Sequence, residues 1–197
     1  MLVRYFGGIA VHLGFDIDGV IANFSLPLIE RIRRDYGVVV KESDIYCYDL
    51  NVVFGITKAE ETKLVEDILI DNLPLYDGAK ETLEQLNKEG HSIYLLTGRW
   101  GHLREATEMW LKENGVHYTE LHLLDVGKKY QANVAPLDVI VEDSLGEAIE
   151  WSGKVKNILI YDHPWNKTLN VRGLTKRVYC WSDIYHEIQQ LQASRNR

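Results

Sequence analysis

The sequence predicts an α/β fold built on a parallel sheet. Short apolar runs rich in Leu and β-branched residues alternate along the chain with segments whose apolar residues recur at helical spacing. Runs that are apolar at successive positions are typical of parallel strands buried on both faces. The alternation of such strands with helices indicates right-handed βαβ units with helices layered on the sheet.

Five apolar segments carry the strand pattern. In chain order they are Ile9–Ile17, His91–Thr97, Glu120–Leu124, Leu137–Val141 and Asn157–Tyr161. Helical segments follow most of them, with apolar residues on one face and capping residues or glycines at their ends. These helices are expected at Asp77–Gly90, His102–Asn114, Ser144–Ser152 and Ser182–Ala193.

The region from Val20 to Tyr76 departs from this alternation. It contains two helical patterns, Ser25–Tyr36 and Thr57–Ile70, with no strong strand pattern between them. The second pattern opens with a capping box, which marks a helix start. We therefore expect residues 1–19 and 77–197 to form the α/β core, and residues 20–76 to form a small helical cap inserted after the first strand.

The composition excludes several classes of protein. The 197 residues are 46% hydrophobic with a net charge of −7, which is ordinary for a soluble globular protein. Without a basic run, a nucleic-acid polymer or a membrane is not expected as partner. Two distant cysteines, Cys47 and Cys180, give no zinc-binding spacing. Neither a signal peptide nor a membrane-spanning stretch is evident, so a cytoplasmic location is expected.

Two acids, Asp16 and Asp18, stand where the first strand ends, and Gly19 follows them. Because side chains alternate along a strand, both carboxylates point the same way until the glycine turns the chain. Like charges placed together are costly unless a cation or a shared proton relieves the repulsion. Taken alone, the motif fits an Asp-Gly turn as well as a reactive site.

Polar residues also follow three other expected strands. Thr97-Gly98 offers a hydroxyl and accessible backbone N–H groups to a phosphate. A lysine of the pair Lys128-Lys129 can neutralise phosphate charge, and Asp143 follows Glu142 at the end of a buried strand. Each motif also has a simpler interpretation on its own: a turn, a solvated lysine pair, or a helix cap.

The order of these motifs is more informative than any one of them. In open α/β sheets the ligand crevice lies at the carboxyl ends of the strands, where the strand order changes direction. If the first and fourth strands are neighbours, Asp16, Asp18 and Asp143 meet there and form an oxygen site suited to Mg²⁺. Thr97 and Lys128 then face that site from the side where a phosphate would lie.

The quartet of motifs resembles that of the haloacid dehalogenase-like superfamily, from about Ile9 to the C-terminal helix. The resemblance implies a Rossmann-like three-layer α/β/α core with strand order 5-4-1-2-3 and a cap inserted after strand 1. It implies that Asp16 is the nucleophile forming an aspartyl-phosphate, and that Asp18 is the general acid and then the general base. These are roles that a covalent intermediate requires.

The same resemblance assigns the ligands. Thr97, Gly98 and Lys128 would hold the phosphoryl group, and Lys128 is preferred to Lys129 for its spacing to Glu142. Mg²⁺ would be bound by Asp16, by the backbone carbonyl of Asp18 and by Asp143.

A narrower resemblance is to the 5′(3′)-deoxyribonucleotidase family and its bacterial relatives. Four segments carry it: Asp16–Phe24, Leu73–Ala79, Tyr161–Asn166 and Tyr179–Asp183. Two departures are Asn23, where the family favours Asp, and Thr97-Gly98-Arg99, where it favours a Thr-Ser/Ala-type stretch. The resemblance implies a Mg²⁺-dependent phosphomonoester hydrolase, a 5′-nucleotidase acting on (deoxy)nucleoside monophosphates.

The cap is expected to choose the substrate. Its aromatic residues, on which a nucleobase could stack or which could pack the cap itself, are Phe24, Tyr46, Tyr48 and Phe54. Phe24 is the best candidate because it lies nearest to Asp16 in sequence. Trp100 is a second candidate, and Arg99 fits either a substrate contact or a surface salt bridge. The histidines His102 and His163 are interpreted as rim residues.

Two other functions remain open from the sequence alone. One is a phosphatase for another small metabolite, such as a sugar phosphate. The other is a non-catalytic binding or regulatory module on the same scaffold, which the intact Asp16/Asp18 pair argues against. Self-association as a homodimer is also left open.

Overall fold

The computed structural model describes residues 10–167 and 173–195, and a parallel sheet lies at its centre. Six strands are paired in the order β3-β2-β1-β4-β5-β6 within these residues. They are β1 (His12–Phe15), β2 (Ser92–Thr97), β3 (Glu120–Leu123), β4 (Val139–Glu142), β5 (Asn157–Tyr161) and β6 (Lys176–Val178). The expected order 5-4-1-2-3 is confirmed, read from the other edge, and β6 extends it. Ile9 of the first predicted strand lies outside the described residues.

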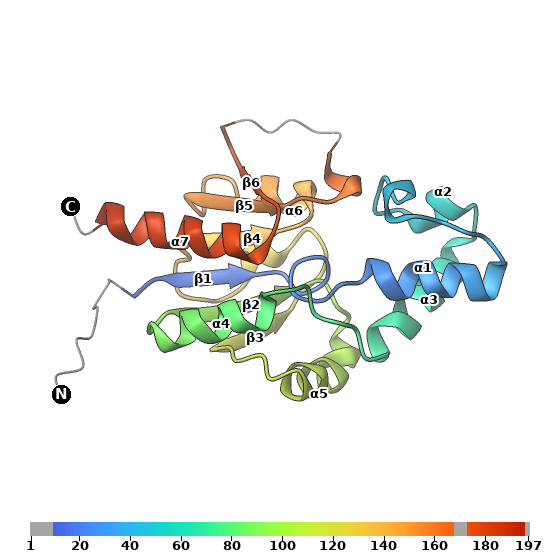
Figure 1. Ribbon diagram of the computed structural model, residues 1–197, viewed down its shortest axis with the longest axis horizontal. Coiled ribbons are helices and arrows are strands. Elements are labelled where there is room, and N and C mark those ends of the chain that lie inside the picture. Colours follow the sequence, from blue (N-terminus) through green and yellow to red (C-terminus); the bar gives the residue numbers. More distant parts are fainter. Residues whose placement is uncertain (1–9, 168–172, 196–197) are drawn as a thin grey trace.

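Helices cover both faces of this sheet and also form a group beyond its end (Figure 1). The α-helices are α1 (Ser25–Tyr36), α2 (Leu50–Phe54), α3 (Lys58–Ile70), α4 (Ala79–Lys88), α5 (Arg104–Glu113), α6 (Leu145–Glu150) and α7 (Trp181–Arg195). Short 3₁₀ turns are η1 (Glu42–Asp44), η2 (Gly101–Leu103), η3 (Lys129–Gln131) and η4 (Pro164–Asn166).

Alternate residues of each strand enter two different hydrophobic cores. On β2, Ile93 and Leu95 pack into the core that includes residues of α4, α5 and α7, whereas Tyr94 and Leu96 pack into the core that includes α6. This is the expected consequence of side chains alternating across a strand that is buried on both faces. The three layers predicted from the apolar runs are therefore present.

Gly14 allows the centre of the sheet to pack tightly. A Cβ atom at this position would lie 2.7 Å from Ile140 Cδ1 and 2.7 Å from Leu137 Cδ1. Side chains that close would force the β1–β4 pair or its covering layer apart. The glycine therefore leaves space for these side chains where β1 and β4, the two strands that carry the predicted acids, lie side by side.

Helices α1, α2 and α3, all within residues 20–76, lie together beyond the carboxyl ends of the strands (Figure 1). The chain enters and leaves this group along one short pairing, in which Asn23 N–H donates to Pro74 C=O and Tyr76 N–H donates to Ile21 C=O. We call this group the cap. The sequence did not predict α2, which is only one turn long.

The last helix fastens the loop that follows β1. Trp181, the first residue of α7, donates its indole N–H to the carbonyl of Val20 at 3.0 Å. Its ring also stacks on Phe15, with centroids 5.5 Å apart. The start of the last helix therefore packs against β1 and the loop that follows it, at the carboxyl ends of the strands.

Candidate active site

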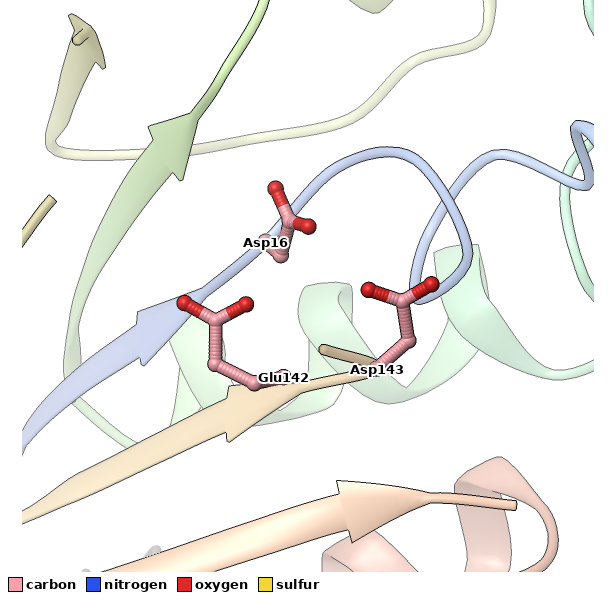
Figure 2. A group of neighbouring side chains, drawn as sticks. All are labelled: Asp16, Glu142 and Asp143. Atoms are coloured by element: carbon pink, nitrogen blue, oxygen red, sulfur yellow. The ribbon is translucent and has the colours of Figure 1, made fainter. Parts of the chain in front are cut away.

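Three buried carboxylates converge at the carboxyl ends of the neighbouring strands β1 and β4 (Figure 2). They belong to Asp16, Glu142 and Asp143, and their nearest oxygens all lie within 4.8 Å of one another. Asp16 is placed by its backbone, whose N–H donates to the carbonyl of Val141 at 3.0 Å. The predicted meeting of Asp16 with Asp143 is thus present, and Glu142 adds a third acid.

Lys129 is the cation that faces these acids. Its Nζ lies 2.9 Å from Asp16 Oδ2 and 3.1 Å from Glu142 Oε2, and its side chain is almost fully buried. Lys128, which the sequence analysis preferred, instead points to solvent and pairs with Asp125 at 2.9 Å. The preference for Lys128 is therefore corrected: the 3₁₀ turn η3 begins at Lys129 and turns only that lysine inward.

The charges of this cluster are unbalanced. Burial raises the pKa of Asp143 to about 7, with the neighbouring Asp16 as the next cause. Burial likewise raises the pKa values of Asp16 and Glu142. Burial alone would lower the pKa of Lys129, but the charges of Asp16 and Glu142 outweigh it and raise that pKa. One ammonium therefore faces three carboxylates. A further positive charge would stabilise the ionised forms of these acids.

These residues fit a divalent cation. Hard oxygen donors on a rigid scaffold are the ligands that Mg²⁺ takes, commonly one or two carboxylates with water and substrate oxygens. Asp16 and Asp143, with the backbone carbonyl of Asp18, would hold it, while Glu142 is occupied by Lys129 and by the indole N–H of Trp151. The raised pKa values are the cost that such an ion would relieve.

Gly19 lets the loop after β1 approach Asp143. Its φ of +85° lies in the left-handed region, and a Cβ there would stand 2.1 Å from Asp143 Oδ2. Any other residue would both strain the turn and push the carboxylate away. The Asp-x-Asp-Gly motif is therefore a turn as well as a part of the site.

A polar cluster after β5 fixes Asp143 from the far side. The indole N–H of Trp165 donates to Asp143 Oδ2 at 3.0 Å, and Asn166 Nδ2 donates to the Asp143 carbonyl at 2.8 Å. His163 lies 2.7 Å from the carbonyl of Gly19 through Nε2 and stacks on Trp165. His163 is buried, so its interpretation as a rim residue was wrong, whereas His102 is exposed as expected.

Thr97 and Gly98 lie at the end of β2. They line one cavity together with Asp16 and Asp143. Thr97 is fully buried, and its Oγ1 accepts a hydrogen bond from the N–H of Arg99 at 3.2 Å. A Cβ on Gly98 would lie 3.0 Å from Val126. The predicted phosphate-binding pair is thus in place, although its role stays a prediction.

The buried Arg99 and the partly buried Asp18 form an ion pair. Arg99 Nε donates to Asp18 Oδ2 at 2.8 Å, and Nη2 donates to Oδ1 at 2.7 Å. The arginine side chain is 1% exposed and that of the aspartate 24%. The sequence analysis offered a surface salt bridge for Arg99, and that alternative is wrong because the partner lies inside the site.

The cavity above these groups measures about 560 Å³ and is bounded by core and cap together. Its cap side is mainly apolar, formed by Phe24, Leu28, Ile45, Leu50, Val65 and Leu69. Trp100, Trp165 and Tyr48 add aromatic surface. Of the other two cap aromatics proposed from the sequence, Tyr46 is exposed and Phe54 packs against the core; neither lines this cavity.

The sequence analysis did not single out Glu147. This residue of α6 is buried, lines the cavity, and accepts the Gly127 N–H at 2.6 Å through Oε1. Its Oε2 has no hydrogen-bond partner among the described residues. A glutamate on a short helix gives no sequence signal of burial, so only the fold identifies it.

The sequence model of the family described as "5′ nucleotidase, deoxy (Pyrimidine), cytosolic type C protein" matches residues 10–195. The chain belongs to this family. Membership confirms the prediction that this protein is a phosphoric monoester hydrolase of the haloacid dehalogenase-like superfamily. It also accounts for the four segments of narrower resemblance, which are spread over the same range.

Individual relatives of this nucleotidase family agree. YqfW of Bacillus subtilis (strain 168), provisionally named a nucleotidase, is 26% identical over 162 residues, which are 80% of this chain and 83% of that protein. A 5′(3′)-deoxyribonucleotidase of the same organism is 24% identical over 179 residues, 89% of this chain and 97% of that protein.

A solved structure shows the same fold. YfnB from Bacillus subtilis, provisionally named a HAD-hydrolase and bound to magnesium, superposes with a TM-score of 0.59 at 12% identity, covering 91% of this chain and 99% of that one. Among the residues that the structure describes, every helix is too short or too polar to cross a bilayer.

Proposed function

We propose that this protein is a Mg²⁺-dependent phosphatase of (deoxy)nucleoside monophosphates that works through an aspartyl-phosphate on Asp16. The observation that carries the proposal is the contact between Asp16 and Lys129 at 2.9 Å, opposite Asp143 and beneath an apolar cavity. A buried carboxylate beside a buried ammonium can attack a phosphorus atom whose charge the ammonium offsets. Family membership supports this reaction class.

Asp16 would attack the phosphorus atom, and the ester P–O bond would break as Asp18 gives its proton to the leaving oxygen. Water would then attack the aspartyl-phosphate while the Asp18 carboxylate takes its proton, which releases phosphate and regenerates Asp16. Lys129, Thr97 and Gly98 would hold the phosphoryl oxygens. Lys129 takes the role first assigned to Lys128.

A bound divalent cation supplies positive charge that polarises the phosphoryl group. Asp16, Asp143 and the Asp18 carbonyl would hold it, and Trp165 would keep Asp143 oriented toward it.

The shape of the cavity supports a nucleotide. Its lining is largely apolar and partly aromatic, and Phe24 and Trp100 are among the aromatic residues that line it. Base–aromatic stacking stabilises a bound base by about 1–3 kcal/mol. A small sugar phosphate would leave most of this lining in contact with water. Residues 20–76 would therefore act as the cap that selects the substrate.

The test is phosphate release from a panel of nucleoside monophosphates, ribose 5-phosphate and p-nitrophenyl phosphate, with and without Mg²⁺. We expect Mg²⁺-dependent turnover with at least one nucleotide preferred over ribose 5-phosphate. Turnover of sugar phosphates alone would remove the nucleotide assignment. No turnover of any ester in Mg²⁺ would remove the catalytic one and favour a binding module.

A further inference from the structure

The fork of Arg99 fixes the plane of the Asp18 carboxylate. Two nearly equal hydrogen bonds, of 2.8 and 2.7 Å, join Nε and Nη2 to the two carboxylate oxygens. Paired charge-assisted bonds of this kind restrain orientation as well as distance. Asp18 keeps one face toward the cavity, which it lines.

Arg99 is itself held by helix α5. Its guanidinium carbon lies 5.1 Å from the centre of the Trp110 ring, and Nη1 lies 3.4 Å from Thr107 Oγ1. Trp110 is fixed in turn, because its indole N–H donates to the carbonyl of Leu73 at 2.8 Å. The Arg99 side chain is 1% exposed, and any movement of its guanidinium away from Asp18 would break these contacts.

We infer that Arg99 is a positioning residue that presents Asp18 to the leaving oxygen of the substrate. This inference rests on the proposed function. Each carboxylate oxygen has two lone pairs, and the guanidinium takes one on each. The remaining lone pairs face the cavity, where Asp18 gives its proton to the ester oxygen as the P–O bond breaks. In the second step the same oxygen takes a proton from the attacking water.

The dependence on the leaving group distinguishes this role from a purely structural one. A nucleoside leaves as an alkoxide and needs the proton, whereas p-nitrophenolate is a stable anion and hardly needs it. Arg99→Lys keeps the positive charge but loses the fork. We expect the single-turnover release of nucleoside, which reports the first step alone, to slow about 10- to 100-fold, a part of the 10²–10⁴ that general acid–base catalysis supplies. The single-turnover release of p-nitrophenolate should slow less than about threefold.

A double-mutant cycle shows whether Arg99 acts through Asp18. The four proteins are the wild type, Arg99→Lys, Asp18→Asn and the double variant, each assayed with both substrates in Mg²⁺. We expect Arg99→Lys to cause no further loss of nucleotide turnover when Asp18 is already Asn. Arg104→Lys is the matched control, because Arg104 lies on α5, the helix that contacts Arg99, but forms an exposed pair with Glu108 at 3.1 Å.

Three results would overturn the inference: equal slowing of single-turnover leaving-group release with both substrates, the same loss in the Asp18→Asn background, or a higher KM for both substrates at unchanged kcat. The last result would mean that Arg99 binds the phosphate. Thermal unfolding shows whether Arg99→Lys is folded. If it is not, Arg99→Gln is the second variant, and the same criteria apply to it. If the wild type hydrolyses neither ester, the proposed function has failed, rather than the role of Arg99.

Discussion

The two sides of the cavity differ in the kind of residue they bury. The core side buries charged groups, which include Asp16, Arg99, Lys129, Glu142 and Asp143. The cap side buries aliphatic groups, which include Leu28, Ile45, Leu50 and Leu69. Buried charges need fixed partners, whereas an apolar wall needs only shape. We therefore place the proposed reaction on the core side and the proposed selection of the substrate on the cap side.

The largest effect should come from the core side. Asp16→Asn removes the proposed nucleophile, so we expect turnover of every substrate to fall about 10⁴-fold or more. Phosphate release in Mg²⁺ is the measurement, and the melting temperature should not fall, because a neutral residue relieves repulsion among the buried acids. Activity that survives this substitution would mean that another group attacks phosphorus.

The adjacent lysines offer a matched pair on the same side. Lys129→Met removes the buried ammonium, and we expect kcat to fall about 10²- to 10³-fold, as when one electrostatic donor is lost. Lys128→Met should change kcat less than about twofold, because exposed ion pairs contribute only ~0–1 kcal/mol. The measurement is kcat of both variants with the same nucleotide, and it shows which lysine contributes to the reaction. A larger loss in Lys128→Met would restore the original sequence preference.

The cap side should affect recognition rather than reaction. In Phe24→Leu a stacking ring is lost, so KM for a nucleotide should rise about tenfold, within the ~1–3 kcal/mol that stacking supplies. The KM for ribose 5-phosphate should stay the same, and this substrate is the internal control. If KM rises equally for both compounds, Phe24 does not contact the base.

The smallest effect is expected where cap and core touch at the surface. Glu66 of α3 lies 2.7 Å from Nε2 of His102, and both side chains are partly exposed. Glu66→Gln should therefore lower the melting temperature by less than about 3 °C and leave kcat unchanged. Thermal unfolding measures this, with Lys63→Gln on the same helix as a comparison. A drop of ten degrees would show that this pair holds the cap in place.

The central strands could be predicted because buried parallel strands appear in the sequence as apolar runs. β6 and α2 could not, since three and five residues carry too little periodicity. The convergence of Asp16 with Asp143 could be predicted once the first and fourth strands were taken as neighbours, an order that the resemblance to the superfamily implied. The choice between Lys128 and Lys129 did not, because it depends on which residue begins a 3₁₀ turn. The Arg99–Asp18 pair joins residues 81 positions apart, and nothing local in the sequence indicates it.

The contact between Trp181 and Val20 has a consequence for biosynthesis. It joins positions 161 residues apart, and it closes the loop that carries both proposed reactive aspartates. A chain still emerging from the ribosome has made that loop but not the helix that fastens it. The loop can therefore reach its final shape only after Trp181 has been synthesised, and a chain that stops short of this residue lacks the contact.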